Sequence, residues 1–198
     1  MKNRYSFSET VKTGFSLFLT KLLFPSARLI RRPLYLRGKK SLVGGKKLTT
    51  GRFCRFDLDG QKKTLFLGEH IQMGDMTHIV ALENVTIGNH VLIASKCFIS
   101  DTSHGATKGD HQESPAVPPA ARRLCTRPVS IGNNVWIGEN AVILSGATVG
   151  DGCIIAANAV VSGVFGKGLI LAGAPAKAIK QWNDKTKSWE KIPEEEQP

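Results

Sequence analysis

The sequence predicts an all-β fold, a parallel β-helix built from six-residue repeats. From Ile131 onward, six consecutive hexads open with Ile or Val, and the fifth residue of each is apolar. Six residues of an α-helix advance by about 600°, which would scatter the openers around the axis and leave no buried face. Short strands that bend at Gly, Asn and Asp corners instead bring both apolar positions inward, and three strands close one coil. The openers are Ile131, Ile137, Ile143, Val149, Ile155 and Val161.

The first 41 residues are predicted to form a basic and apolar helical segment. A helix is expected over residues 7–24, with Ser8 as its N-cap and Pro25 after its end. Residues 1–50 contain twelve Lys or Arg and one acidic residue, which accounts for the whole net charge of +11. The segment is expected to dock on an anionic inner membrane or to cap the open end of the coil, and both roles are compatible.

Residues 42–180 are predicted to form the repeat domain, with about five coils. Weaker hexads precede the regular ones, with a phase break at residues 60–66, a two-residue slip at Val85 and no repeats over 100–130. Residues 181–198 are expected to form a short C-terminal helix and a polar tail. The earlier hexads begin at Leu42, Leu48, Cys54, Leu67, Met73, Ile79, Ile87, Ile93 and Ile99.

Composition limits the class of protein. No apolar run reaches the roughly 18 residues of a transmembrane helix, and the first residues lack the features of a signal peptide, so a cytoplasmic protein is expected. The four cysteines show no C-x-x-C spacing, which favours buried thiols over a metal site or disulfides. The basic N-terminus has almost no interleaved aromatic residues, which argues against a nucleic-acid partner.

The long loop at 100–130 is the first place to look for chemistry, because a segment without repeats inside a regular coil is usually functional. It contains His104 and His111 together with several charged residues. A neutral imidazole suits the removal of a proton from a hydroxyl group near pH 7. Asp101 could orient the imidazole, bind substrate, or serve as an ordinary turn residue.

Three motifs resemble the hexapeptide-repeat acyltransferases, a family of left-handed β-helix enzymes. They are the hexads [ILV]-[GA]-x-x-[AVC]-x, the string N-N-V-W-I-G at 133–138 and the terminal G-x-P-A-K at 173–177. The resemblance implies a left-handed coil, acetyl-CoA as the acyl donor without a metal, and a homotrimer with active sites between subunits. The strings S-D-x-x-H-G and W-E-K-I are most similar to O-acetyltransferases of lipopolysaccharide O-antigen and capsule assembly, which are related to maltose and galactoside acetyltransferases.

The resemblance also implies roles for individual residues. His104 would be the catalytic base, since the family's catalytic histidine lies on the first arm of this loop. Asp75 and His78 would contact the acceptor, and Trp136 would line the site between subunits. The backbone N–H near Glu139 would hold the oxyanion.

Coenzyme A in such enzymes lies in the groove between neighbouring coils. Its pantetheine arm would bond to backbone groups next to the small residues Ala157, Ser162 and Gly163. Its phosphates would meet Lys177 and Lys180 as point charges.

The function that these observations favour is transfer of an acetyl group to a sugar hydroxyl of a cell-surface polysaccharide or its lipid-linked precursor. Two alternatives remain at this point. One is an acetyltransferase for a small soluble sugar or xenobiotic, which shares most of the motifs. The other is a non-catalytic repeat scaffold. The five histidines lack the spacing of a carbonic anhydrase relative with metal at its subunit interfaces.

Overall fold

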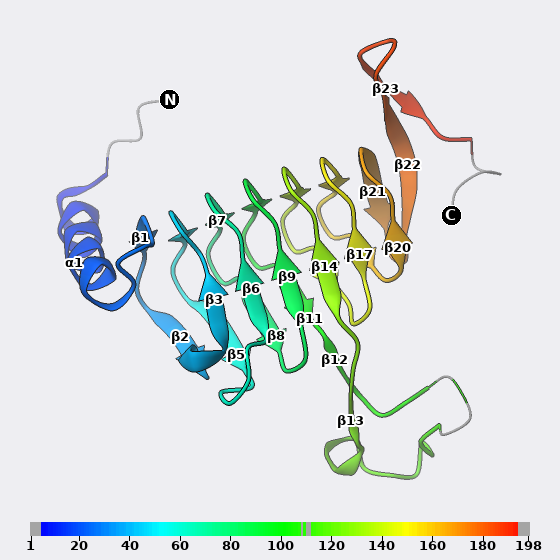
Figure 1. Ribbon diagram of the computed structural model, residues 1–198, viewed down its shortest axis with the longest axis horizontal. Coiled ribbons are helices and arrows are strands. Elements are labelled where there is room, and N and C mark those ends of the chain that lie inside the picture. Colours follow the sequence, from blue (N-terminus) through cyan, green and yellow to red (C-terminus); the bar gives the residue numbers. More distant parts are fainter. Residues whose placement is uncertain (1–4, 108, 110–111, 194–198) are drawn as a thin grey trace.

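The computed structural model describes residues 5–107, 109 and 112–193, and its main body is a parallel β-helix with three sheets (Figure 1). The chain passes through sheets 1, 2 and 3 in turn and completes six coils within the described residues. Sheet 1 contains β1 (Leu29–Ile30), β4 (Thr49–Thr50), β7 (Gln72–Met73), β10 (Leu92–Ile93), β15 (Trp136–Ile137), β18 (Ile154–Ile155), β21 (Leu169–Gly173), β22 (Ala176–Asn183) and β23 (Ser188–Lys191). Sheet 2 contains β2 (Leu34–Arg37), β5 (Cys54–Leu58), β8 (His78–Ala81), β11 (Phe98–Ser100), β16 (Val142–Ile143) and β19 (Val160–Val161). Sheet 3 contains β3 (Leu42–Gly44), β6 (Leu65–Leu67), β9 (Val85–Ile87), β14 (Val129–Ile131), β17 (Thr148–Val149) and β20 (Val164–Phe165).

The remaining elements decorate this coil. A hairpin of β12 (Thr102–His104) and β13 (Leu124–Thr126) interrupts the fourth coil, and helix α1 (Phe7–Leu23) lies at the N-terminal end. Two short 3-10 helices, η1 (Lys39–Ser41) and η2 (Pro119–Ala121), lie in connections.

The interior of the coil is formed by the openers that the hexad pattern predicts. The strands stack in register, so that Ile93 pairs with Ile137 and Ile137 with Ile155. All three side chains are at most 1% exposed. This stacking removes one continuous column of β-branched side chains from water, which is the main source of stability. The predicted class of stacked parallel coils is confirmed.

Backbone N–H groups at the corner between sheets 3 and 1 are capped by side chains of the following coil. The N–H of Glu69 donates to Asn89 Oδ1 at 2.8 Å, that of Asn89 to Asn133 Oδ1 at 2.9 Å, and that of Asn133 to Asp151 Oδ1 at 2.6 Å. Each acceptor lies in the same register as its donor, one coil later. Groups that would otherwise lack partners are thereby satisfied.

The coil begins earlier than predicted. Strands β1 and β2 already form its first coil, so the boundary at residue 42 is wrong. Leu34 and Leu36 alternate with the exposed Tyr35 and Arg37. This strand alternation among many basic residues hides the hexad pattern.

Helix α1 has almost the expected bounds but a different cap. Ser6 is the N-cap, and its side chain and that of Glu9 form a capping box, whereas Ser8 already lies inside the helix. The predicted cap at Ser8 is therefore wrong by one half-turn. No described helix is both long and apolar enough to cross a bilayer.

The predicted C-terminal helix is wrong, because residues 176–191 form two antiparallel strands. Strand β22 pairs with β21 and then with β23, and so covers the edge at which the coil ends. Trp182 and Trp189 pack edge to face across the hairpin, with ring centroids 5.5 Å apart. Pairing of the open edge and this aromatic contact outweigh the charged composition that suggested a helix.

Candidate active site

His104 lies on the hairpin that projects between sheets 2 and 3 (Figure 1). It pairs with Leu124 across the antiparallel strands and is exposed to solvent. The imidazole is therefore accessible for proton transfer with a bound hydroxyl group. The second predicted candidate, His111, lies outside the described residues.

Asp101 has a structural role at the base of this hairpin. Its side chain is fully buried, and Oδ2 accepts the backbone N–H groups of Leu82, Glu83 and Asn84 at 3.0, 2.7 and 2.9 Å. Its carbonyl accepts the N–H of Arg127 at 2.9 Å. These hydrogen bonds are those of a turn residue. Within the described residues none of the hydrogen bonds of this carboxylate reaches His104, and its roles in orienting the imidazole or binding substrate stay predictions.

The edge between sheets 1 and 2 brings together three predicted residues, Asp75, Glu139 and Ala157. Asp75 Oδ1 accepts the N–H of Arg52 at 2.7 Å, and Glu139 Oε2 accepts the N–H of Ser95 at 3.1 Å. Both carboxylates thus cap the preceding coil, as the side chains at the other corner do.

The backbone N–H of Glu139 is left without a partner at this edge. Pairing of Ile137 with Ile155 puts Ala157 at the position that should cap it, and a methyl group cannot accept a hydrogen bond. Within the described residues this N–H makes no hydrogen bond. Three residues earlier, Trp136 is 50% exposed on the outer face of sheet 1. A free N–H on a rigid corner is the feature that an oxyanion donor requires.

His78 lies on the outer face of sheet 2, where it contacts Asp57, a residue that no sequence motif singles out. Its Nε2 is 3.0 Å from Oδ2 of Asp57, which also accepts from Arg55 Nε at 2.6 Å. Partial burial favours a raised pKa for Asp57, but the hydrogen bonds from Arg55 and His78 outweigh it and the pKa is lowered. The strand alternation C-R-F-D-L could have indicated that Asp57 points outward, one coil before His78.

The residues predicted for coenzyme A lie on the last coil and on the strand that follows the coil. Ser162 and Gly163 are exposed at the corner between sheets 2 and 3, where Gly163 has φ of 137°. Lys177 and Lys180 lie on β22, opposite Ala172 and Ile170 of β21. Backbone at the corner is uncovered because Gly163 has no side chain.

Within one chain, the predicted catalytic histidine lies at a different edge of the coil from Trp136, Glu139 and Ala157. His104 stands at the edge between sheets 2 and 3, whereas Trp136, Glu139 and Ala157 gather at the edge between sheets 1 and 2. Sheet 2 lies between the two groups. Each group is accessible to a second molecule.

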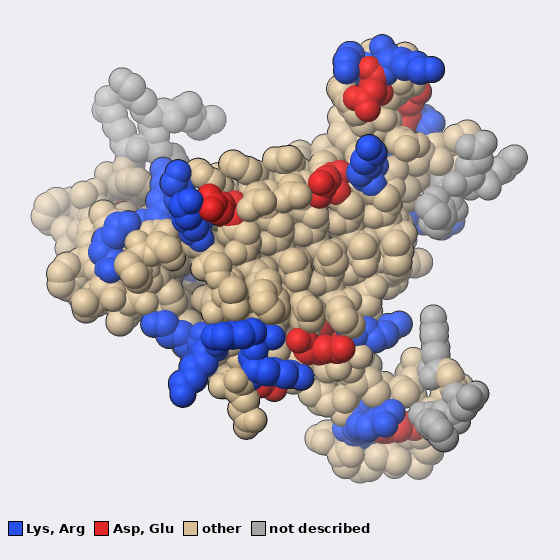
Figure 2. All heavy atoms as spheres, in the orientation of Figure 1, with Lys and Arg blue, Asp and Glu red and all other residues tan. Residues whose placement is uncertain are grey.

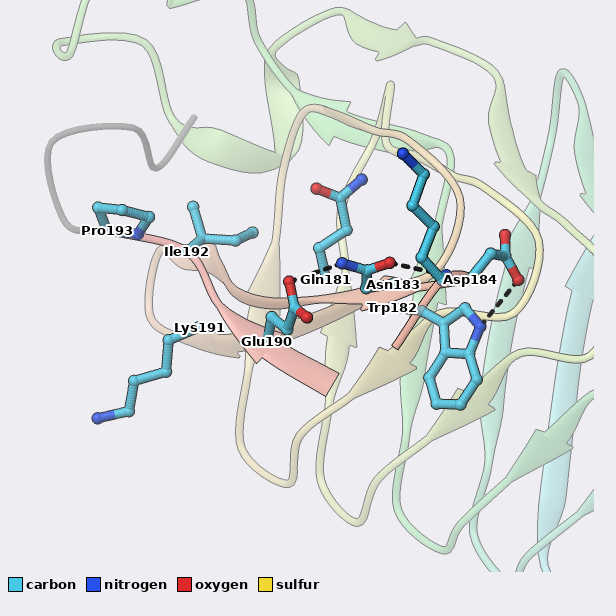
Figure 3. A pocket seen from close by; sticks show the side chains of 9 residues that line it. Gln181, Trp182, Asn183, Asp184, Glu190, Lys191, Ile192 and Pro193 are labelled. Atoms are coloured by element: carbon cyan, nitrogen blue, oxygen red, sulfur yellow. Dashed lines mark hydrogen bonds between the residues drawn. The ribbon is translucent and has the colours of Figure 1, made fainter. Parts of the chain in front are cut away.

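A hollow of about 500 Å³ lies at the C-terminal hairpin (Figure 3). Four of its side chains are already paired with one another, because Trp182 Nε1 donates to Asp184 at 3.2 Å and Asn183 Nδ2 donates to Glu190 at 2.9 Å. None of the predicted site residues lines this hollow. It therefore contributes nothing to the candidate active site.

Metal ligands do not cluster in the described part of the chain, where no three His, Cys, Asp or Glu side chains are close enough to hold one ion. The buried cysteines are also poor ligands, because burial raises the pKa of Cys54 and of Cys97 to about 11.

The coil, its projecting hairpin and its exposed corners define a repeat protein of the parallel β-helix class. A family model described as "Bacterial transferase hexapeptide (six repeats)" matches residues 128–163. The lipopolysaccharide biosynthesis O-acetyl transferase WbbJ of Escherichia coli K12, named as putative, is 39% identical over 192 residues, covering 96% of this chain and 97% of that protein. The galactoside O-acetyltransferase of the same strain is 36% identical over 53% of this chain and 48% of its own length. The chain therefore belongs to the bacterial hexapeptide-repeat transferases.

Solved structures agree with this family. A hexapeptide-repeat acetyltransferase of Vibrio cholerae, complexed with acetyl-CoA, is 25% identical with a TM-score of 0.58, covering 74% of this chain and 75% of that one. A galactoside acetyltransferase in complex with coenzyme A is 26% identical with a TM-score of 0.51, covering 74% and 72%.

Proposed function

We propose that the protein is an acetyl-CoA-dependent O-acetyltransferase that acts on a sugar hydroxyl of a cell-surface polysaccharide or of its lipid-linked precursor. The observation that carries this proposal is the similarity to WbbJ over 96% of the chain. It extends beyond the repeats to α1 and the hairpin that bears His104. The acetyl-CoA and coenzyme A bound to two solved relatives support the donor.

In the proposed reaction, His104 is the general base. Its neutral imidazole takes the proton of the sugar hydroxyl while the oxygen attacks the thioester carbonyl carbon of acetyl-CoA. The tetrahedral intermediate collapses with cleavage of the carbon–sulfur bond. The thiolate of coenzyme A leaves and takes up the proton from the imidazolium.

The oxyanion of that intermediate is proposed to bind the free backbone N–H of Glu139. Support comes from the missing cap at Ala157, which leaves this donor unsatisfied at an accessible corner. Because the corner is fixed by strands on both sides, little reorganisation is needed during the reaction. Trp136, Asp75 and His78 are proposed to line the acceptor pocket.

Coenzyme A is proposed to lie beside Ala157, Ser162 and Gly163, with its phosphates near Lys177 and Lys180. We further propose that the active unit is a homotrimer. The hairpin of one subunit would bring His104 to the edge of a neighbour that carries Trp136 and Glu139. The separation of these groups by sheet 2 within one chain supports this arrangement. Since acetyl-CoA is the donor, the reaction is proposed to occur on the cytoplasmic side.

The test is release of coenzyme A from acetyl-CoA in the presence of glycan acceptors, measured for the wild type and for His104→Ala. Loss of a general base should lower kcat by about 10²- to 10⁴-fold. His90→Ala is the matched control, because His90 is also exposed but lies on a corner of sheet 1. Its turnover should equal that of the wild type.

Outcomes of this assay separate the alternatives. Glycan-dependent release that disappears in His104→Ala supports both reaction and base. Equal release from both proteins would remove His104 as the base and direct attention to His111. Faster release with small soluble sugars than with glycan extracts would favour an acceptor like that of the galactoside enzyme. A protein that neither binds nor cleaves acetyl-CoA would be a scaffold.

A further inference from the structure

Helix α1 carries an exposed apolar face that the proposed reaction does not use. The side chains of this apolar stripe are between 56% and 86% exposed. At about 100° per residue they fall within an arc of about 80° on the helix surface. They are Phe7, Val11, Phe15, Phe18 and Leu22.

The helix is attached to the coil by its polar side. Ser16 and Thr20 are its buried residues, and Thr20 Oγ1 accepts the backbone N–H of Ile30 at 2.8 Å. These two positions lie about 160° from the centre of the apolar stripe. A helix that serves only to cap a hydrophobic core buries its apolar side against that core. Here the polar side faces the coil, so the exposed apolar stripe needs another partner to cover it.

Cations surround the apolar stripe on all sides. Lys12 and Lys21 lie on its two flanks, both exposed. At the helix ends, Arg31 contacts the hydroxyl of Tyr5 at 3.2 Å, and Lys39 contacts the carbonyl of Leu23 at 3.0 Å. Figure 2 shows this end of the molecule as a mainly uncharged surface bordered by Lys and Arg side chains.

Acidic residues are missing from the surrounding sequence. Between Glu9 and Asp57 the chain contains twelve Lys or Arg and no Asp or Glu. A second copy docked by the same face would bring like charges together, which is unfavourable. An anionic lipid surface complements both features, since aromatic and aliphatic side chains enter the headgroup boundary while lysines and arginines contact lipid phosphates.

We propose that α1 docks the enzyme on the surface of an anionic phospholipid bilayer, with the apolar stripe inserted and its polar side still fastened to the coil. The stripe then lies in the plane of the interface, and the β-helix projects away from it. The inference does not depend on the proposed reaction. It makes the two roles expected for the N-terminal segment compatible, because opposite faces of one helix would perform them.

The experiment is co-sedimentation of the full-length protein with vesicles of phosphatidylcholine alone or with about one third phosphatidylglycerol. The wild type should bind the anionic vesicles, and binding should weaken when salt is raised, because screening reduces the attraction. Phe15→Ser combined with Phe18→Ser should lower the affinity by about tenfold for each residue. Val164→Ser is the matched control, since Val164 is 76% exposed at the opposite end of the coil.

Charge is tested separately with Lys12→Gln combined with Lys21→Gln. Each lost cation should lower the affinity for anionic vesicles by about fivefold. Failure of the wild type to bind anionic vesicles, or unchanged binding by the Phe15 and Phe18 variant, overturns the proposal. A change of oligomeric state in that variant without lipid, seen by light scattering, also overturns it, because the stripe would then be covered by a second copy.

Discussion

Replacing Ala157 with Asn should abolish most of the activity while making the fold more stable. At the corner between sheets 3 and 1, Asn133 Oδ1 accepts the N–H of Asn89, which lies one coil earlier, at 2.9 Å. An amide at position 157 occupies the equivalent register relative to Glu139. It should therefore accept the N–H that is free in the wild type and remove it as an oxyanion donor.

The expected magnitude follows from the chemistry of that donor. Loss of one oxyanion hydrogen bond costs about 10²–10³ in kcat, or about 2.7–4 kcal/mol. The lost hydrogen bond forms only in the transition state, so its removal should lower kcat, whereas any rise in the KM for acetyl-CoA comes from the bulk of the new side chain and should be equal in an Ala157→Leu variant. The same new hydrogen bond should add about 1 kcal/mol to the free energy of unfolding. For a chain of this size the melting temperature should then rise by about 2–4 °C.

Ala157→Leu is the matched control, because Leu has nearly the shape of Asn but no acceptor. The assay is steady-state release of coenzyme A, with thermal unfolding measured on the same samples. Asn should be at least about tenfold slower than Leu, and only Asn should raise the melting temperature. Equal losses in both variants would mean that bulk alone obstructs the groove. Full activity in the Asn variant would refute the assignment of this N–H.

Three further outcomes are expected. Asp101→Ala leaves three partly buried backbone N–H groups unpaired and should lower the free energy of unfolding by about 3 kcal/mol in denaturant titration, whereas destabilisation below about 1 kcal/mol would contradict its structural role. At pH 8 an alkylating reagent should modify the partly exposed Cys125 but not the buried Cys54 or Cys97. Burial raises the pKa of the Cys54 and Cys97 thiols to about 11, which leaves about 0.1% of each as thiolate. Rapid modification of either buried thiol would show that the coil opens. The backbone N–H of Asn133 lowers the pKa of Asp151 below its ordinary 3.8, so this carboxylate should stabilise the fold above about pH 4 and lose that effect as the pH falls through its lowered pKa. Asp151→Asn should make the free energy of unfolding less dependent on pH in that acidic range. An unchanged pH dependence would contradict the stabilising role of this hydrogen bond.

The hexads determined the architecture without any tertiary information. Ile131, Ile137 and Ile143 recur at a period that no helix can bury, and strands with glycine and asparagine corners are the remaining solution. The same spacing located a long loop, because repeats stop after Ile99 and resume at Ile131, but only the structure shows that this loop begins and ends in the antiparallel strands β12 and β13. Local periodicity was sufficient here since each coil contacts only its neighbours.

The hexad pattern did not predict the two ends of the coil. The first coil uses Leu34 and Leu36 in a plain strand alternation, and the C-terminal strands are fixed by pairing with β21 and by the contact of Trp182 with Trp189. The charged composition around residue 189 favoured a helix. This segment forms strands instead because it pairs with the open edge of sheet 1, and that edge exists only after the coil has formed.

For the site, motifs in the sequence were enough to indicate His104 and Trp136. Three further features become visible only when the coils are stacked. Asp101 accepts hydrogen bonds from backbone N–H groups, Asp57 contacts His78, and Ala157 leaves the N–H of Glu139 without a partner among the described residues. These are relations between residues about 20 positions apart in neighbouring coils. Their register is set by stacking, so the hydrogen bonds that distinguish a structural carboxylate from a reactive one arise only when the coils are packed together.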